Sequence, residues 1–161
     1  LTVSFQIATT FALLKFLNLY GSRVGVVLIY AAIQLPFTVM TFSSFIKGVP
    51  REIDEAAMID GCGPLRLIFL IIMPIMKPIM ITNLIVTAIQ TWNNFMIPLF
   101  YLDSSEKWTI PLMVYNFFGQ YSRNWNYVFA MLVITILPVI ILYLCLQKYI
   151  VEGMTSGAVK G

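Results

Sequence analysis

Residues 51–78, REIDEAAMIDGCGPLRLIFLIIMPIMKP, carry the strongest structural signal in this chain. The first part of the stretch is polar and rich in charge, whereas the rest is apolar enough to enter a membrane. Pro50 suits the first turn of a helix, and the acidic residues that follow favour the positive N-terminal end of the helix dipole. Gly61 is placed to end that helix in the left-handed conformation. We therefore expect a short helix over 51–61, outside the hydrocarbon, followed by a membrane-spanning helix.

The composition places the whole chain in a membrane. Of its 161 residues, 60% are hydrophobic and 11% are charged, whereas soluble domains carry about 25% charged residues. Windows 24–46, 67–90 and 127–147 have the roughly 20 apolar residues that cross a bilayer, and window 1–17 is nearly long enough. The expected fold is all-α: a polytopic bundle of about four transmembrane helices and one short helix outside them.

Several other classes of protein are not indicated. The chain begins with Leu1 and shows no signal peptide, so the simplest interpretation is a fragment that lacks its N-terminal part. Histidine is absent, and Cys62 and Cys145 lie far apart, so we expect neither a metal site nor a disulfide. No basic run indicates nucleic acid. No G-x-x-x-x-G-K-[ST] phosphate loop is present, so we expect no nucleotide-binding or catalytic site.

The distribution of lysine and arginine predicts the orientation of the chain. The polar loop and the tail carry Lys47, Arg51, Arg66, Lys148 and Lys160, and the connections on the other side carry Arg23, Lys107 and Arg123. Positive residues are enriched in cytoplasmic loops. Five against three therefore places the loop and the C-terminus in the cytoplasm.

The spacing within the polar loop resembles a known family. Glu55-Ala56-Ala57 is followed after three residues by Gly61, and after nine more by Ile71-x-Met73-Pro74. This pattern resembles the EAA loop of bacterial ABC importer permeases, with Met73 in place of the usual Leu. The resemblance implies that 47–74 is the EAA loop and 51–61 its coupling helix, which docks on an ATPase subunit. The residues implied in coupling are Glu55, Ala56, Ala57, Asp60, Gly61 and Pro74. The alternative is an ordinary amphipathic helix on the membrane surface.

Two further segments are similar to carbohydrate importers of the maltose and multiple-sugar type. The tail 147–161, QKYIVEGMTSGAVKG, looks like the end of these permeases. Trp92-Asn93-Asn94-Phe95-x-x-Pro98-Leu99 resembles their Trp-Asn-Asp/Glu-Phe-x-x-Pro-Leu, with Asn94 in place of the usual acid. Members of this family typically have six spanning helices. The resemblance therefore covers 1–161 as a transmembrane domain truncated at its N-terminus.

The resemblance implies the function and the partners. The chain is expected to be a permease subunit in a bacterial inner membrane, binding no cofactor itself, with ATP and Mg on separate ATPase subunits. Its other expected partners are a second homologous permease, an extracytoplasmic solute-binding protein, a sugar and membrane lipid. Permeases for other solutes, such as glycerol phosphate, stay open. An ion-gradient transporter is disfavoured because all seven acidic residues lie in loops or the tail.

The substrate path has candidates in and before the second motif. Aromatic faces stack on sugars and amides bond their hydroxyls, so we single out Trp92, Asn93, Asn94, Phe95 and Gln90. The alternative for Trp92 is an aromatic residue at the membrane interface beside a turn. Gln90, Gln34, Asn83 and Thr87 are polar residues within apolar windows. They could line a path, or they could bond neighbouring helices.

Overall fold

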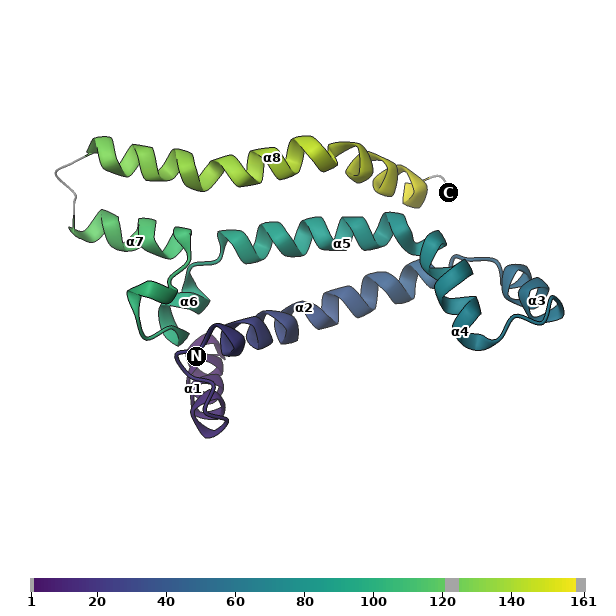
Figure 1. Cartoon of the computed structure of the whole chain (residues 1–161), viewed down its shortest axis with the longest axis horizontal. Helices are drawn as coiled ribbons and strands as arrows, with labels where there is room; N and C mark the ends of the chain where they lie inside the picture. The colour runs from purple at the N-terminus through teal and green to yellow at the C-terminus, as the bar shows by residue number, and fades with distance from the viewer. Residues whose placement is uncertain (1, 121–124, 159–161) are drawn as a thin grey trace. The chain divides into compact units, whose positions relative to one another are not determined.

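The computed structural model describes residues 2–120 and 125–158, with side chains over 6–118 and 125–145. The described residues form helices and no strand, which confirms the all-α prediction (Figure 1). The elements are α1 (Thr2–Phe16), α2 (Arg23–Ile46), α3 (Arg51–Ile59), α4 (Pro64–Arg66), the π-helix η1 (Leu67–Ile72), α5 (Met73–Asn93), α6 (Met96–Tyr101), the 3-10 helix η2 (Ser105–Lys107), α7 (Ile110–Gln120) and α8 (Trp125–Ala158).

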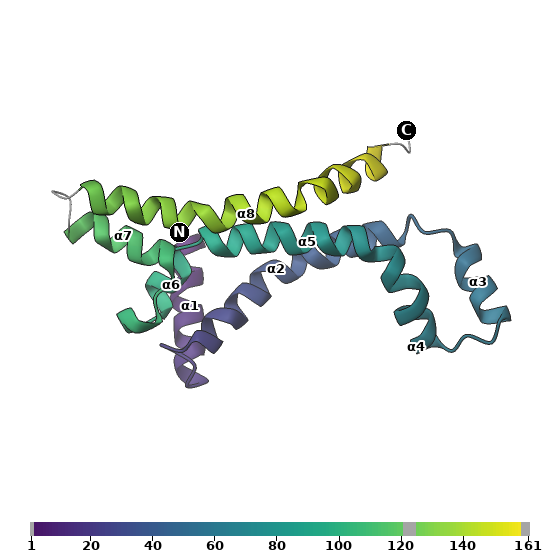
Figure 2. The ribbon, with the colours of Figure 1, turned by 45° about the horizontal axis from the view of Figure 1, so that its top comes forward.

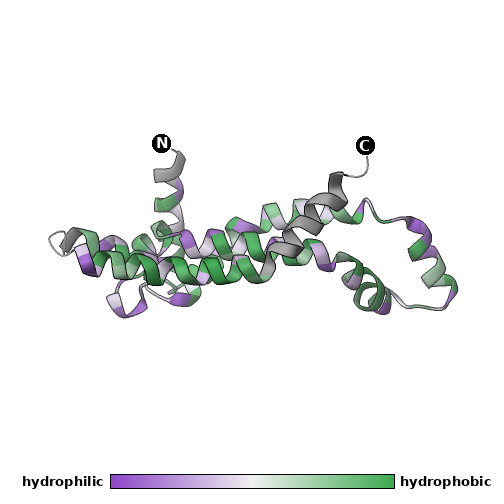
Figure 3. Ribbon diagram, turned by 90° about the horizontal axis from the view of Figure 1, so that it is seen from above, coloured by the Kyte–Doolittle hydropathy of each residue, from purple (hydrophilic) through white to green (hydrophobic). Residues whose placement is uncertain are grey.

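Three helical stretches are long and apolar enough to cross a membrane. They are Arg23–Ile46, Pro64–Asn93 and Trp125–Cys145, and apolar residues dominate them in Figure 3. They correspond to three of the four predicted windows. The fourth window forms α1, a helix of 15 residues.

The chain divides into two compact units, each built from two stretches. Unit 1 comprises Leu1–Ile33 and Ala88–Leu142, and unit 2 comprises Gln34–Thr87 and Tyr143–Gly161. The core of unit 1 is a cluster of Leu14, Val26, Tyr101 and Leu102. This cluster packs the end of α1 and the start of α2 against the end of α6.

A polar corner, which we call the Gly21 corner, links the turn between α1 and α2 to the loop after α6. The N–H of Gly21 donates to the carbonyl of Tyr101 at 3.1 Å. Lys107 Nζ donates to the Gly21 carbonyl at 2.7 Å and to Asp103 Oδ1 at 2.9 Å. Gly21 has φ +73°, and an added Cβ would lie 2.6 Å from the Asp103 carboxyl carbon. Both the conformation and the space therefore require glycine here.

The connection over residues 91–126 contains more helix than its sequence suggested. These residues lie between the predicted windows 67–90 and 127–147, and the structure forms α6, η2 and α7 there. α7 buries Leu112 and Val114 completely or nearly so. An apolar helix of 11 residues is too short to stand out as a span, which explains why window length alone missed it.

The last helix continues into the expected tail. α8 runs without interruption to Ala158, although we expected the spanning segment to end near 147. Pro138 lies inside it. The tail residues that carried the resemblance to sugar permeases, 147–161, lie outside the described side chains, and so do Arg123, Lys148 and Lys160 of the charge count.

Candidate functional site

The polar loop contains a short helix, as predicted. α3 comprises nine residues, and Pro50 precedes it with extended backbone angles, φ −60° and ψ 135°. Pro50 is thus the N-cap rather than part of the first turn. Glu52 and Asp54 lie in the first turn, where a negative charge is favoured by the helix dipole. The helix ends at Ile59, two residues before the predicted end.

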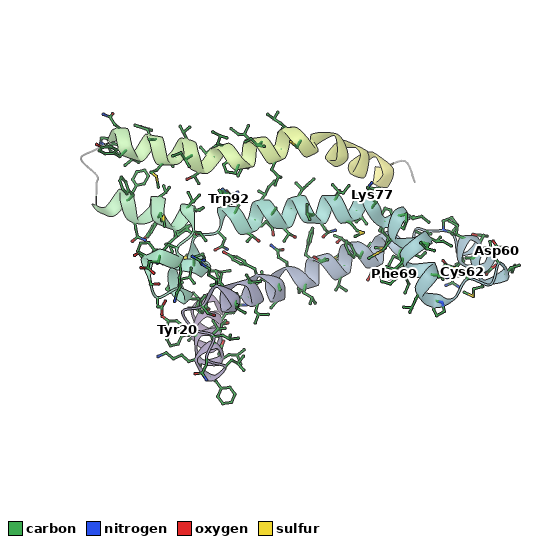
Figure 4. The ribbon with its side chains drawn as sticks, in the orientation of Figure 1. Tyr20, Asp60, Cys62, Phe69, Lys77 and Trp92 are labelled. Atoms are coloured by element: carbon green, nitrogen blue, oxygen red, sulfur yellow. The ribbon has the colours of Figure 1, made fainter. Side chains whose placement is uncertain are left out.

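The end of α3 is fixed by a complete Schellman motif. The N–H of Gly61 donates to the carbonyl of Met58 at 3.0 Å, and the N–H of Cys62 donates to that of Ala57 at 2.9 Å. Gly61 has the left-handed φ of +72°, and nothing lies within 4 Å of an added Cβ. The requirement for glycine at 61 is therefore conformational and not steric. Figure 4 shows Asp60 and Cys62 at this turn.

The two alanines of the loop have different environments. Ala56 is exposed, whereas only 5% of Ala57 is exposed. Ala57 is thus covered by the chain itself, and the coupling role that the resemblance implies for both alanines stays a prediction. Glu55, Asp60 and Gly61 are exposed. Asp54, one turn before Ala57, has a buried Oδ1 without a hydrogen-bond partner among the described residues.

Two exposed apolar residues of α3 were missed by the sequence analysis. Ile59 is 86% exposed and Met58 is 62% exposed. Ile59 follows Glu55 by four residues and Ala56 by three, so the three residues share one helix face. That spacing was visible in the sequence and could have identified Ile59. We call Glu55, Ala56 and Ile59 the outer face of α3.

The helix that follows the loop begins in an unusual register. After α4, the π-helix η1 precedes α5, and the N–H of Met73 donates to the carbonyl of Ile68 five residues back. Pro74 has no N–H, and inside an α-helix its ring would clash with the carbonyl of residue 70. A π-turn widens the backbone at this point. α4 and η1 turn away from the line of α5 (Figures 1 and 2). Figure 4 labels Phe69 in η1, before the turn, and Lys77 in α5, after it.

The motif at 92–95 packs elements of unit 1 together. Trp92 Nε1 donates to the carbonyl of Thr135 at 3.0 Å and so connects α5 to α8, and Figure 4 labels Trp92 on the side of α5 that faces α8. Asn94 Oδ1 accepts the N–H of Ile97 at 3.0 Å at the start of α6. The ring of Phe95 stacks on Tyr115 of α7, with centroids 4.8 Å apart.

The five substrate-path candidates therefore divide into two groups. Three of them, Trp92, Asn94 and Phe95, use their polar group or ring in a contact within unit 1. Asn93 and Gln90 are exposed, and Gln90 also makes an interaction within the chain. The geometry supports a packing role for the first group. Their contact with a sugar stays a prediction.

Comparison with known proteins identifies the family. The family described as "Binding-protein-dependent transport system inner membrane component" matches residues 3–156. The chain belongs to this family. It is therefore a multi-pass membrane protein, and the resemblance stated from its loop and tail is confirmed. No solved structure matches the chain.

Relatives within this family resemble the chain over most of its length. The multiple sugar-binding transport system permease protein MsmG of Streptococcus mutans is 41% identical over 84% of this chain and 50% of its own length. The melibiose/raffinose/stachyose import permease protein MelC of Bacillus subtilis is 38% identical over 84% and 49%. The arabinooligosaccharides transport system permease protein AraQ of Bacillus subtilis is 37% identical over 90% and 51%. The chain thus spans about half the length of these relatives.

Proposed function

We propose that the chain is part of the membrane-spanning domain of an ABC importer permease, and that this permease translocates a carbohydrate delivered by a solute-binding protein. Family membership supports the transport role, and the names of the relatives MsmG, MelC and AraQ support the substrate class. ATP is hydrolysed on separate ATPase subunits, and a second homologous permease completes the membrane part. The polar loop and the C-terminus face the cytoplasm.

The observation that carries this proposal is the outer face of α3. Its small Ala56 and its exposed Ile59 form an apolar spot beside the carboxylate of Glu55. An exposed isoleucine on a nine-residue helix gains by burial against a partner, and the carboxylate can pair with basic or N–H groups at the rim. Gly61 fixes the angle at which the chain leaves α3. In our proposal α3 is the coupling helix, which the ATPase subunit moves when ATP closes the ATPase dimer.

Alternating access then arises from movement of the helices that flank α3. In the proposed cycle, closure of the ATPase dimer displaces α3, and α2 and α5 carry the displacement into the membrane. The turn at η1 and Pro74 is the point where the direction of the chain changes between α4 and α5. A sugar released by the binding protein crosses between this permease and its partner.

The test compares two matched substitutions in the full importer. Ile59→Asp places a charge on the outer face of α3, and Leu65→Asp makes the same change at a residue of α4 that is 69% exposed. We expect Ile59→Asp to abolish co-purification of the ATPase subunit and ATP-driven uptake, and Leu65→Asp to retain both. Equal behaviour of the two variants would contradict the docking assignment. Identifying the solute bound by the cognate binding protein tests the substrate class.

A further inference from the structure

A buried polar pair connects two helices of unit 2. Asn83 of α5 is 5% exposed and is the one buried polar or charged residue in the part of the chain that the structure describes. Its Nδ2 donates to Thr41 Oγ1 of α2 at 2.9 Å and to the carbonyl of Ile79 at 3.1 Å. Its Oδ1 lies 3.0 Å from the Thr41 hydroxyl. Both hydrogens of the Asn83 amide group are thus used, one within the helix and one between helices.

The pair lies in the two helices that flank the polar loop. α2 ends at Ile46 and leads into α3, and α5 begins at Met73 after η1. The hydrocarbon offers no water to replace a lost partner, so an unpaired amide is unfavourable there. Asn83 could have been a residue of the substrate path, but its amide is covered and bonded. The geometry therefore indicates a joint between helices.

A neighbouring threonine provides the comparison within the same helix. Thr82 Oγ1 donates to the carbonyl of Pro78 in its own helix at 3.0 Å. A threonine in an apolar helix can therefore satisfy its hydroxyl within its own helix. The hydroxyl of Thr41 does not by itself require a partner on α5. The side-chain amide of Asn83 carries two donors and one acceptor oxygen. It is therefore the group that requires a partner on another helix.

We propose that Asn83 and Thr41 are positioning residues that hold α2 and α5 together through the transport cycle, so that a displacement of α3 reaches both helices at once. This rests on the proposed function, because it specifies how motion leaves the coupling helix. Without the pair, each helix receives the displacement separately through its own connection to α3. ATP hydrolysis then continues while less sugar moves for each ATP.

The first experiment measures sugar transported per ATP hydrolysed by the full importer in proteoliposomes, with radiolabelled raffinose, melibiose and maltotriose as probes. We expect Thr41→Val and Asn83→Leu each to lower this ratio by about threefold or more, and the double variant to lower it no further. Thr41→Ser keeps the hydroxyl and is expected to restore the ratio, and Thr82→Val is the matched control at wild-type level. A merely structural role would reduce uptake and hydrolysis together and leave the ratio unchanged, and that result would overturn the proposal.

The second experiment joins the two positions covalently. Cysteines replace Thr41 and Asn83 in a background where Cys62 and Cys145 are serine, and the pair is oxidised or joined with a short bis-maleimide. We expect a cross-link that leaves ATP-driven uptake intact, because the helices stay together. Failure to cross-link, or uptake lost on oxidation and restored by reductant, would overturn the proposal. Failure of the proposed function is distinct, because the unsubstituted importer would then transport none of the sugars.

Discussion

At the residue scale, Gly61 and Gly63 of the polar loop allow the effect of backbone conformation to be measured without a steric clash. Gly61 has φ +72° and Gly63 has φ −69°, and neither has any atom within 4 Å of an added Cβ. A methyl group added at either position therefore does not clash with a neighbouring atom. Any difference between the two variants must come from the backbone conformation, because left-handed geometry disfavours every residue that carries a Cβ.

We predict that Gly61→Ala destabilises the end of α3 by about 1–2 kcal/mol, whereas Gly63→Ala has little effect. Hydrogen exchange of the amides of α3 in the full importer measures this difference directly. Gly61→Asn should fall between the two, because asparagine tolerates the left-handed region better than alanine. Equal protection in the two alanine variants would show that the Schellman motif does not hold the helix end.

A second residue-scale prediction concerns the Gly21 corner. The hydrogen bond from Lys107 holds the pKa of the Asp103 carboxyl below its usual range. A lowered folded-state pKa gives stability that is present above the usual carboxyl range and is lost as the pH falls through the lowered value. We expect acidification to loosen the contact of the turn after α1 with residues 101–107, as seen in the pH dependence of the unfolding temperature. Asp103→Asn should flatten that dependence, and an unchanged profile would contradict the assignment.

At the element scale, the structure gives the motif at 92–95 a packing role that can be separated from sugar contact. Trp92 joins α5 to α8, Asn94 bonds the start of α6, and Phe95 stacks on α7. These contacts bring four helices of unit 1 to one place. A residue that only packs affects stability, whereas a residue that also touches sugar affects the apparent affinity for it.

We predict that Trp92→Phe lowers stability by about 0.6 kcal/mol, the average for a hydrogen bond between membrane helices, and leaves the KM for sugar unchanged. Trp125→Phe is the control, because Trp125 is exposed at the start of α8 and contacts Phe118 and Phe129 only through its ring. Thermal unfolding and uptake kinetics of the two variants provide the comparison. A raised KM in Trp92→Phe alone would instead establish sugar contact.

The π-turn before α5 provides another prediction at this scale. Pro74→Ala restores an N–H and removes the ring, so the reason for the wide turn disappears. We expect the spin-label distance between cysteines at positions 66 and 80 to lengthen towards the roughly 21 Å of a straight helix of 14 steps. Pro78→Ala, within the regular part of α5, is the control and should change the distance little. No lengthening in Pro74→Ala would mean that another residue sets the turn.

At the scale of the whole molecule, the proposed orientation in the membrane rests on the distribution of lysine and arginine and can be tested with a native residue. Cys62 is half-buried in the polar loop, and Cys145 is exposed in the apolar part of α8. A Cys145→Ser background leaves Cys62 as the single cysteine of these 161 residues. We predict that a membrane-impermeant maleimide labels Cys62 in inside-out vesicles and not in right-side-out ones. The opposite pattern would reverse the proposed orientation.

Features that depend on contiguous residues could be predicted from the sequence alone. The length and hydropathy of the apolar runs identified the three spanning stretches, because crossing a bilayer requires about 20 apolar residues in succession. The acidic start and Gly61 located α3, because capping and the left-handed glycine act within a few residues of the helix ends. The same reasoning failed for α7. Its apolar run is shorter than a span, and its apolar residues Leu112 and Val114 are buried by packing within unit 1.

The packing of the helices sets which side chains are exposed and which are engaged in contacts within the chain. It leaves Ala57 covered while Ala56 and Ile59 are exposed. It pairs Trp92 with Thr135, 43 residues away, and Asn83 with Thr41, 42 residues away. The physical reason is that a polar group in an apolar helix must find a partner. Which partner it finds depends on the helix that packs beside it, and no local pattern encodes that neighbour.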